Sequence, residues 1–253
     1  MKRLLTRADD FGSGRGANRA ILEACDGGFI QNVSVMAGGP FVEEGADVLA
    51  RSGKCIGMHA VLNSEWDRVK WTPCAPKKNI PSLLDEDGEF PWQTAWFLEH
   101  PPELSEILRE FDAQLDRLTA LGLPVSYVDM HMMPYPEVPG LQEEMSRWIA
   151  QKGLIDHMPY YHSLSSFGPE NAMTPEEGLA HWREWLSAFE DGQYFCVLHP
   201  FCKGEGSELM GNADVPTAWV EDSRETEYQL LVSGALERLC KELEITPVRY
   251  DEL

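Results

Sequence analysis

The chain has 253 residues, of which 43% are hydrophobic and 10% aromatic, and its 42 acidic and 21 basic residues give a formal net charge of −21. A chain of this length and apolar content can bury a core without disulfide support, which argues against a disordered segment. The acidic excess argues against a nucleic-acid partner and against an anionic membrane surface, because both require a basic footprint.

Short apolar runs alternate with amphipathic stretches in the first part of the chain. The pattern predicts strands at 2–8, 31–36 and 54–62, separated by helices at 15–26 and 41–51. The loop after the first strand, DDFGSGRG, has no GxGxxG fingerprint, which weighs against dinucleotide binding.

The stretch 64–102 interrupts this rhythm. It is rich in proline and holds Trp66, Trp71, Trp92 and Trp96. Loops of this length in compact domains are usually lids or binding loops, so we expect an insertion that covers one end of the domain.

The alternation of helices and strands resumes after the insertion. Helices are predicted at 103–121, 138–151, 175–190 and 222–243, strands at 125–130, 154–157, 193–198 and 245–250, and irregular stretches at 158–174 and from 199 to about 214. About seven β/α units in one domain, 1–253, predict an α/β fold with a parallel sheet. Polar residues at the carboxyl ends of four strands favour a barrel over an open sheet, because barrel strands converge on one mouth.

The cysteines and the start of the chain bear on location. The six cysteines form no CxxC pair, and Cys25, Cys55, Cys196 and Cys240 lie in apolar segments where buried, reduced thiols are expected. No apolar run approaches 18 residues, and no apolar leader segment follows MKRLLTRADD. We therefore expect a cytoplasmic protein without a membrane partner; a homodimer is compatible with the sequence.

Side chains capable of chemistry follow four of the predicted strands. They are Asp9 and Asp10 after the first strand, His59 in the third, Asp129 and His131 in the strand at 125–130, and His199 after the strand at 193–198. Each has a simpler explanation when taken alone, such as a helix cap for one aspartate or a buried core histidine. Together, Asp10, His59 and His131 form a two-histidine, one-carboxylate set that suits a divalent metal and leaves positions open for water and substrate.

The set does not choose its metal. Zinc, iron, manganese and magnesium are all compatible, and we expect one divalent ion, Mg²⁺ or Zn²⁺. Adjacent strand residues point to opposite sides, so Asp9 and Asp10 cannot share one task unless the strand has ended; one could bind the metal and the other take a proton. Asp129 is two residues from His131, and a carboxylate beside a histidine can orient its ring.

Other residues are candidates for binding a small-molecule or oligosaccharide substrate. Trp66 and Trp71 are expected at the mouth of the barrel, where flat aromatic faces stack on sugar rings, and Asn63 and Glu65 lie between His59 and these tryptophans. Arg224 is a candidate for orienting an acidic neighbour.

Several further residues have weaker assignments. Trp92 and Trp96 are explained at least as well by a role in pinning the insertion to the barrel. His157 and His162 lie in the aromatic stretch DHMPYYH and are candidates for lining a cleft, whereas His181 lies on an amphipathic helix and is expected to face solvent.

The stretches TRADDFG, GMHAVLNSEW, VDMHMMP and VLHP, in this order, resemble the YdjC-like carbohydrate deacetylases, and DSRETEYQLL is similar to that family as well. The resemblance spans nearly the whole chain. It implies a deformed (β/α) barrel related to polysaccharide deacetylases and metal-dependent hydrolysis of an N-acetyl group on an amino sugar or oligosaccharide. It also implies that Asp10, His59 and His131 hold the metal, that Asp9 is the general base, and that His199 lies near the leaving group.

The chain departs from the family pattern in two places. Many relatives carry further histidines where this chain has Met132 and Met133, and many have GLHLNL where it has GMHAVLNSEW, which bears on the substrate more than on the chemistry. Two alternatives stay open: another metal-dependent barrel enzyme acting on sugars, such as an isomerase or amide hydrolase, and a sugar-binding relative that has lost catalysis.

Overall fold

The computed structural model describes residues 1–160 and 174–253. The strands are β1 (Lys2–Phe11), β2 (Asn32–Val35), β3 (Cys55–Ala60), β4 (Val125–Met130), β5 (Ile155–Asp156), β6 (Gly192–Leu198) and β7 (Ile245–Val248). The α-helices are α1 (Arg15–Cys25), α2 (Ala46–Ala50), α3 (Trp96–Glu99), α4 (Leu104–Ala120), α5 (Leu141–Lys152), α6 (Pro175–Ser187), α7 (Thr217–Val232) and α8 (Ala235–Glu242). Short 3₁₀ turns lie at Lys77–Asn79, Pro81–Leu83, Met158–Tyr160, Ser207–Leu209 and Tyr250–Glu252.

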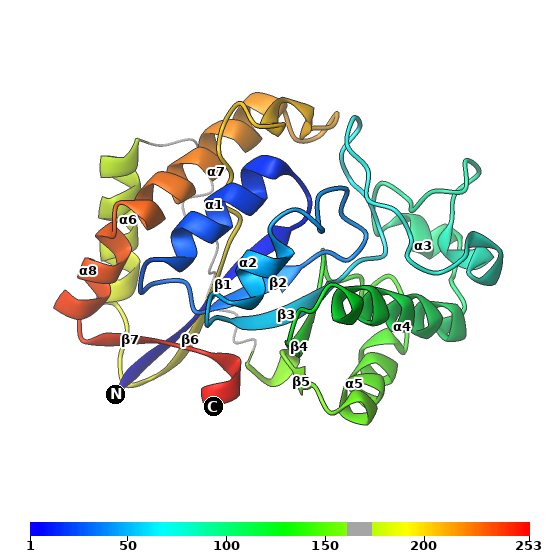
Figure 1. The fold of residues 1–253 in the computed structure, drawn as a ribbon, viewed down its shortest axis with the longest axis horizontal. Helices are drawn as coiled ribbons and strands as arrows, with labels where there is room; N and C mark the ends of the chain where they lie inside the picture. Colours follow the sequence, from blue (N-terminus) through cyan, green and yellow to red (C-terminus); the bar gives the residue numbers. More distant parts are fainter. Residues whose placement is uncertain (161–173) are drawn as a thin grey trace.

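All seven strands pair in parallel in one curled sheet of order β5-β4-β3-β2-β1-β6, and β7 pairs with β1. Helices α1, α6, α7 and α8 cover one flank, and α4 and α5 cover the other (Figure 1). Within the described residues β5 and β6 do not pair, so the sheet is a half-barrel with a seam between these two strands. The predicted deformed α/β barrel of about seven units is confirmed.

The concave face of the sheet is built from every second residue of each strand. These residues are Leu5, Arg7 and Asp9 from β1, Cys55, Gly57 and His59 from β3, Tyr127, Asp129 and His131 from β4 and its end, and Phe195, Val197 and His199 from β6 and its end. The apolar members of this set, Leu5, Cys55, Tyr127, Phe195 and Val197, form a small cluster with Val248 and Tyr250. The members at the carboxyl ends of the strands are polar. The two-residue repeat of a strand therefore places one chemically active side chain from each of four strands at the same edge.

Two predicted helices differ from the structure. The helix expected at 41–51 is reduced to α2, preceded by turns. The helix expected at 222–243 is two helices, because Gly234 adopts a left-handed φ of 67° and ends α7 before α8 begins. An amphipathic pattern that continues across the break could not reveal it.

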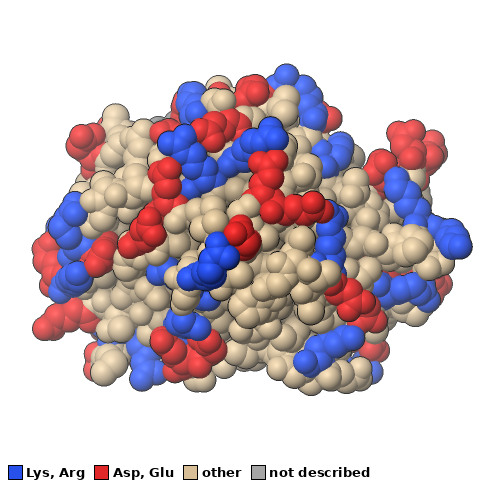
Figure 2. All heavy atoms as spheres, in the orientation of Figure 1, with Lys and Arg blue, Asp and Glu red and all other residues tan. Residues whose placement is uncertain are grey.

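The insertion between β3 and α4 contains the first two 3₁₀ turns and α3, and it projects beyond the carboxyl ends of the strands (Figure 1). Cys25, Cys55, Cys196 and Cys240 are buried free thiols, as expected. Within the described ranges, no helix combines the length and the apolar character that crossing a bilayer requires. On the face shown in Figure 2, acidic and basic side chains are interleaved. Arg19–Glu23 and Lys241–Glu237 are ion pairs one helical turn apart.

Gly57 tests the packing of the concave face. A Cβ atom at this position would lie 2.3 Å from the ring of Tyr127, which is fully buried. We expect Gly57→Ala to lower the free energy of unfolding by about 1–3 kcal/mol, the range for an overpacked core. Gly27→Ala is the control, because its Cβ would meet only ordinary contacts. Urea denaturation measures both variants, and equal stabilities would contradict this account of the barrel interior.

Candidate metal centre

Asp9 and Asp10 lie inside β1 rather than after it, and a local distortion brings both carboxylates to the same cleft. Asp10 has a φ of 68°, unusual for a residue other than glycine, and the register between β1 and β2 shifts between Ala8 and Phe11. This kink breaks the alternation that would point adjacent side chains to opposite faces. Asp9 and Asp10 therefore both line one cleft of about 580 Å³ at the carboxyl edge of the sheet.

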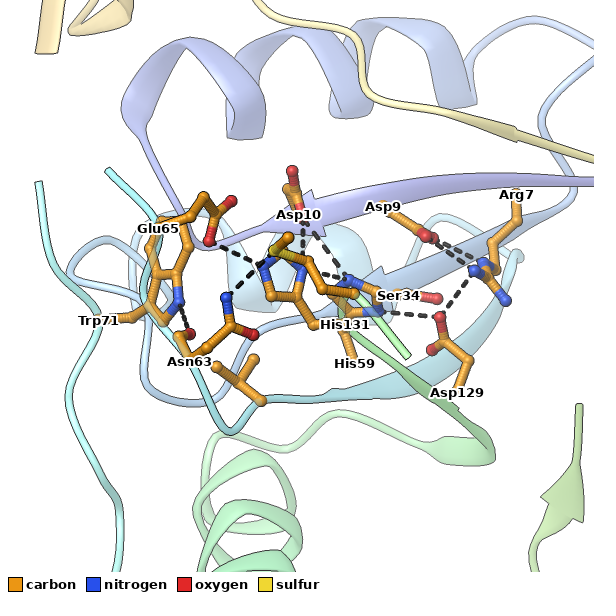
Figure 3. Close-up of polar contacts among 12 residues, drawn as sticks. Arg7, Asp9, Asp10, Ser34, His59, Asn63, Glu65, Trp71, Asp129 and His131 are labelled. Carbon is orange, nitrogen blue, oxygen red and sulfur yellow. Dashed lines mark hydrogen bonds and ion pairs between the residues drawn. The ribbon is translucent and has the colours of Figure 1, made fainter. Parts of the chain in front are cut away.

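Asp10, His59 and His131 converge in this cleft (Figure 3). His59 Nε2 is 3.1 Å from His131 Nδ1, and Asp10 Oδ1 is 3.6 Å from the first nitrogen and 3.7 Å from the second. All three side chains are buried. The structure thus brings together the three residues that the sequence suggested as metal ligands.

Each histidine is oriented by a different carboxylate. His59 Nδ1 donates to Asp129 Oδ2 at 2.8 Å, and His131 Nε2 donates to Glu65 Oε2 at 3.0 Å. Asp129 therefore orients His59 on the neighbouring strand, not His131 as the sequence suggested, because His59 and Asp129 are direct partners in the β3–β4 register. Glu65, predicted to contact substrate, lies against His131 at the edge of the cleft.

These contacts leave a position that fits a divalent cation. When the outer nitrogen of each neutral ring carries the proton, His59 Nε2 and His131 Nδ1 direct lone pairs at each other. Asp10 Oδ1 is buried, and no hydrogen bond reaches it from residues 1–160 or 174–253. Two imidazole nitrogens and one carboxylate oxygen are a donor set that Zn²⁺ and related ions accept.

The electrostatics of the cluster favour positive charge. Burial alone would raise the pKa of Asp10, but the charges of Arg224 and the nearby histidines hold it well below its usual range. Burial would lower the pKa of His59, but Asp129, Asp9 and Asp10 raise it to about 9. The carboxylates that raise the pKa of His59 would also attract a metal cation, so the electrostatics of the site favour cation binding.

Arg7 is a functional-site residue that sequence reasoning missed. It is inward-facing on β1, two residues before Asp9, and its side chain is only 5% exposed. Its Nε donates to Asp9 Oδ1 at 2.6 Å, and its Nη2 donates to Asp9 Oδ2 at 2.8 Å and lies 2.8 Å from Asp129 Oδ2. The available signal was its position two residues before Asp9, which places both side chains on the same face of the strand.

His199 lines the cleft at the end of β6, and its backbone N–H donates to Glu227 Oε2 at 2.6 Å. Burial lowers the pKa of the His199 ring, with the charge of Asp10 opposing that effect. Burial also raises the pKa of Glu227 to about 7, although the His199 N–H and Arg224 favour its ionised form. Glu227 on α7 was not singled out from the sequence.

Arg224 and Trp66 form one wall of the cleft. Arg224 Nη1 lies 3.1 Å from Asp10 Oδ2, so its acidic neighbour is Asp10, and its role in orienting that carboxylate stays a prediction. Its guanidinium also sits over the Trp66 ring, 5.7 Å from the centroid, and Trp66 is only 5% exposed. Trp66 reaches the cleft, but Arg224 covers a face that a sugar ring would need.

Trp71 and Asn63 support the site from behind. The Trp71 indole N–H donates to the Asn63 backbone oxygen at 2.6 Å, and the Trp71 ring packs edge-on against His131 with centroids 5.7 Å apart. Both residues are buried, and the Asn63 side chain donates to the sulfur of Met132 at 3.1 Å. Neither is placed to contact a molecule in the cleft, where Trp92 offers the more exposed aromatic surface at 41%.

The remaining candidates lie away from the cluster. The Trp96 ring stacks on His100 within the insertion, with centroids 4.1 Å apart. His157 is buried beneath the site, and burial lowers its pKa to about 4. His181 is exposed on α6 as expected, and His162 lies outside the described residues.

A parallel half-barrel with buried aspartate and histidine side chains at its carboxyl edge defines the chain as an α/β-barrel protein with a candidate metal site. Residues 3–155 match the family model described as YdjC-like protein. The chain belongs to this family.

Relatives by sequence carry deacetylase names. The chain is 33% identical over 128 residues to a carbohydrate deacetylase of Geobacillus stearothermophilus, a match that covers 50% of this chain and 48% of the relative. It is 33% identical over 158 residues to a chitooligosaccharide deacetylase of Enterobacter sp. (strain 638), covering 60% and 58%. The match therefore spans about half the length of these relatives.

Solved structures share the fold. A crystal structure from Enterococcus faecalis V583, provisionally described as a cellobiose-phosphate cleavage protein, superposes with a TM-score of 0.79 at 20% identity and covers 99% of this chain and 98% of its own. The catalytic domain of a peptidoglycan N-acetylglucosamine deacetylase from Eubacterium rectale ATCC 33656 gives a TM-score of 0.56 at 8% identity, covering 98% and 89%. At these identities the likeness concerns the fold alone.

Removing any of the three convergent side chains should abolish tight metal binding. We expect Asp10→Ala, His59→Ala and His131→Ala each to weaken Zn²⁺ binding by more than about 100-fold, beyond the 10–100-fold that loss of an outer partner costs. Isothermal titration calorimetry on the metal-stripped protein measures the affinity. His181→Ala, on the exposed face of α6, is the matched control. A single member that can be removed without loss of affinity is not a ligand.

Glu227 should make stability depend on pH. Because its pKa is raised in the folded state, to about 7 from a usual value near 4.5, its contribution is fully present below the unfolded pKa and is lost as pH rises through 7. Between about pH 4.5 and 7 the wild type should lose up to about 3 kcal/mol relative to Glu227→Gln, less where solvent reaches the carboxylate. Urea unfolding across this pH range measures the difference, and parallel curves would show an ordinary carboxylate.

Proposed function

We propose that the protein is a metal-dependent deacetylase that hydrolyses the N-acetyl group of an amino sugar or a short oligosaccharide. The observation that carries the proposal is the cleft itself, in which a cation position formed by Asp10, His59 and His131 lies beside Asp9 and His199. The names of the sequence relatives support the substrate class, since they are carbohydrate and chitooligosaccharide deacetylases.

Asp10, His59 and His131 would hold a divalent ion, which would supply the chemistry that amide hydrolysis requires by polarising a carbonyl and lowering the pKa of water. We propose Zn²⁺ rather than Mg²⁺, because two of the three donors are imidazole nitrogens and Mg²⁺ prefers oxygen ligands. His59 and His131 are held in the required tautomer by Asp129 and Glu65, so the donor atoms are oriented before the ion arrives.

Asp9 is proposed as the general base. A carboxylate oxygen of Asp9 lies within 4.8 Å of a ring nitrogen of His59, close to the cation position but outside the three-ligand set. Both of its oxygens accept hydrogen bonds from Arg7, which holds the carboxylate in one orientation. Each oxygen keeps a further lone pair, so Asp9 can still accept the proton of a water molecule in the cleft.

His199 is proposed as the acid that protonates the departing amine nitrogen. It comes from β6, on the opposite side of β1 from the strands that carry His59 and His131, so it faces the cation position across the cleft. Glu227 accepts the His199 backbone N–H and fixes the turn that presents the ring. Burial lowers the pKa of the ring, which makes its protonated form a stronger acid.

The cleft suits a compact polar substrate with apolar patches. Its volume of about 580 Å³ falls in the range of small-molecule sites, and its walls combine Trp92, Met132 and Met133 with carboxylates and Arg224. We also propose a cytoplasmic location, supported by six free cysteines, which suit a reducing compartment.

The variant Asp9→Asn distinguishes a general base from a metal ligand, because loss of a base lowers kcat and loss of a ligand lowers metal affinity. The variant should bind Zn²⁺ within about threefold of wild type and lose about 10²–10⁴-fold in kcat, because it removes a proton acceptor but no ligand. Acetate release from N-acetylated mono- and oligosaccharides, with Zn²⁺, Co²⁺, Mn²⁺ or Mg²⁺ added in turn, measures turnover.

Asp191→Asn is the control, because Asp191 is an exposed residue paired with the amino terminus. If Asp9→Asn loses its metal, Asp9 is a ligand and the division of roles within the pair is reversed. If metal-loaded wild type releases no acetate from any sugar of the panel, the proposed activity is rejected.

A further inference from the structure

Arg7 carries a positive charge into the interior beside the cluster, next to Asp9 and Asp129 (Figure 3). A buried charge is costly unless it is fully paired. Its guanidinium forms a two-bond fork to Asp9, contacts Asp129 Oδ2, and lies over the Phe195 ring, 5.0 Å from the centroid. The group is thus held by two carboxylates and an aromatic face.

The same carboxylates belong to a second group of potential ligands. One oxygen or nitrogen from each of Asp9, His59 and Asp129 lies within 4.8 Å of the others, all buried. In this second group, however, a cation is already present, because the Arg7 guanidinium bridges the two aspartates. The cleft therefore has two positions for positive charge side by side, and His59 belongs to both groups.

Tyr250 makes a further contact with the Arg7 guanidinium. Arg7 Nη1 donates to the Tyr250 hydroxyl at 3.3 Å. Tyr250 is 1% exposed, its backbone N–H donates to Asn32 Oδ1 at 2.9 Å, and its ring packs on Tyr127 with centroids 4.3 Å apart. A residue two positions beyond the end of β7 therefore contacts the charge that β1 carries.

We propose that Arg7 is a positioning residue that acts as a fixed internal cation. It holds Asp9 and Asp129 in place, keeps both carboxylates from binding metal, and limits the cleft to one divalent ion; Tyr250 sets its position. Asp129 Oδ2 accepts from His59 and lies 2.8 Å from Arg7 Nη2, so the orientation of the His59 ring depends on the same guanidinium. The inference rests on the proposed function for its effect on turnover, but its effect on metal binding does not require a substrate.

Arg7→Ala tests the proposal through stoichiometry. Co²⁺ titration, followed by visible absorption and calorimetry, should show one ion per wild-type chain and a second ion in Arg7→Ala, because the freed carboxylates face an open position. Arg7→Lys keeps a point charge and should bind one Co²⁺, but it loses the fork to Asp9, so kcat should fall about 10–100-fold with KM little changed.

Guanidinium rescue tests the same idea on turnover. Arg7 lines the cleft, so an added guanidinium ion can reach its position from solvent. Millimolar guanidinium chloride should raise kcat of Arg7→Ala and compete with the second Co²⁺, and it should do neither in wild type. Arg7→Ala that binds one Co²⁺ and does not respond to guanidinium would overturn the proposal.

A matched tyrosine pair keeps the test decisive if Arg7→Ala does not fold. Tyr250→Phe removes the hydroxyl that Arg7 contacts, and Tyr127→Phe removes a buried hydroxyl of the same cluster that bonds Ser34 instead. Tyr250→Phe should lower kcat about 3–10-fold and change the Co²⁺ spectrum, whereas Tyr127→Phe should change neither. Identical spectra for the two variants would overturn the role of Tyr250. If wild type releases no acetate, the proposed function fails while the Co²⁺ comparisons still decide this inference.

Discussion

The crowding of negative charge at the carboxyl edge of the sheet is the constraint around which the site is built. Asp9, Asp10, Asp129 and Glu65 lie in or beside one buried cluster, and in the described part of the chain only Arg7 and Arg224 are placed among them as permanent cations. Among these permanently charged groups the negative charges outnumber the positive ones by two, and burial makes such an imbalance costly. The raised pKa of His59 reflects the same imbalance, because a proton on its ring offsets part of it. A bound divalent ion would neutralise this excess of negative charge. The carboxylates that attract the ion are therefore also stabilised by it.

Much of this edge could be predicted because strand geometry is simple. Residues two apart share a face, so the sequence predicted that His59, Asp129 and His131 would meet at one edge once the sheet was parallel. The pairing of Asp129 with His59 could not be predicted, because it depends on the register between β3 and β4. The kink at Asp10 was equally hidden, since no glycine or proline marks its left-handed backbone.

The tryptophans show where residue type alone misleads. A tryptophan close to a metal ligand in sequence suggests a sugar platform, yet Trp71 is buried against His131 and Trp66 lies under Arg224. Trp92, more distant in sequence, is the one that presents an open surface to the cleft. Distance along a loop does not determine how its side chains pack, because the insertion folds back on itself through contacts that no local pattern specifies.

The pairing of β1 also governs the order in which the molecule can be completed. Lys2 lies beside Gly192 on β6 and beside Ile245 on β7, so the first strand made is flanked by the last two. Contacts so distant in sequence close slowly, because the chain must lose the entropy of large loops before they form. During synthesis, part of the edge of β1 therefore stays unpaired until almost the whole chain has emerged. This strand carries Asp9 and Asp10. The aspartates of the cleft lie on strands made early, β1 and β4, whereas His199 and Arg224, which complete its wall, belong to the last part of the chain to be made.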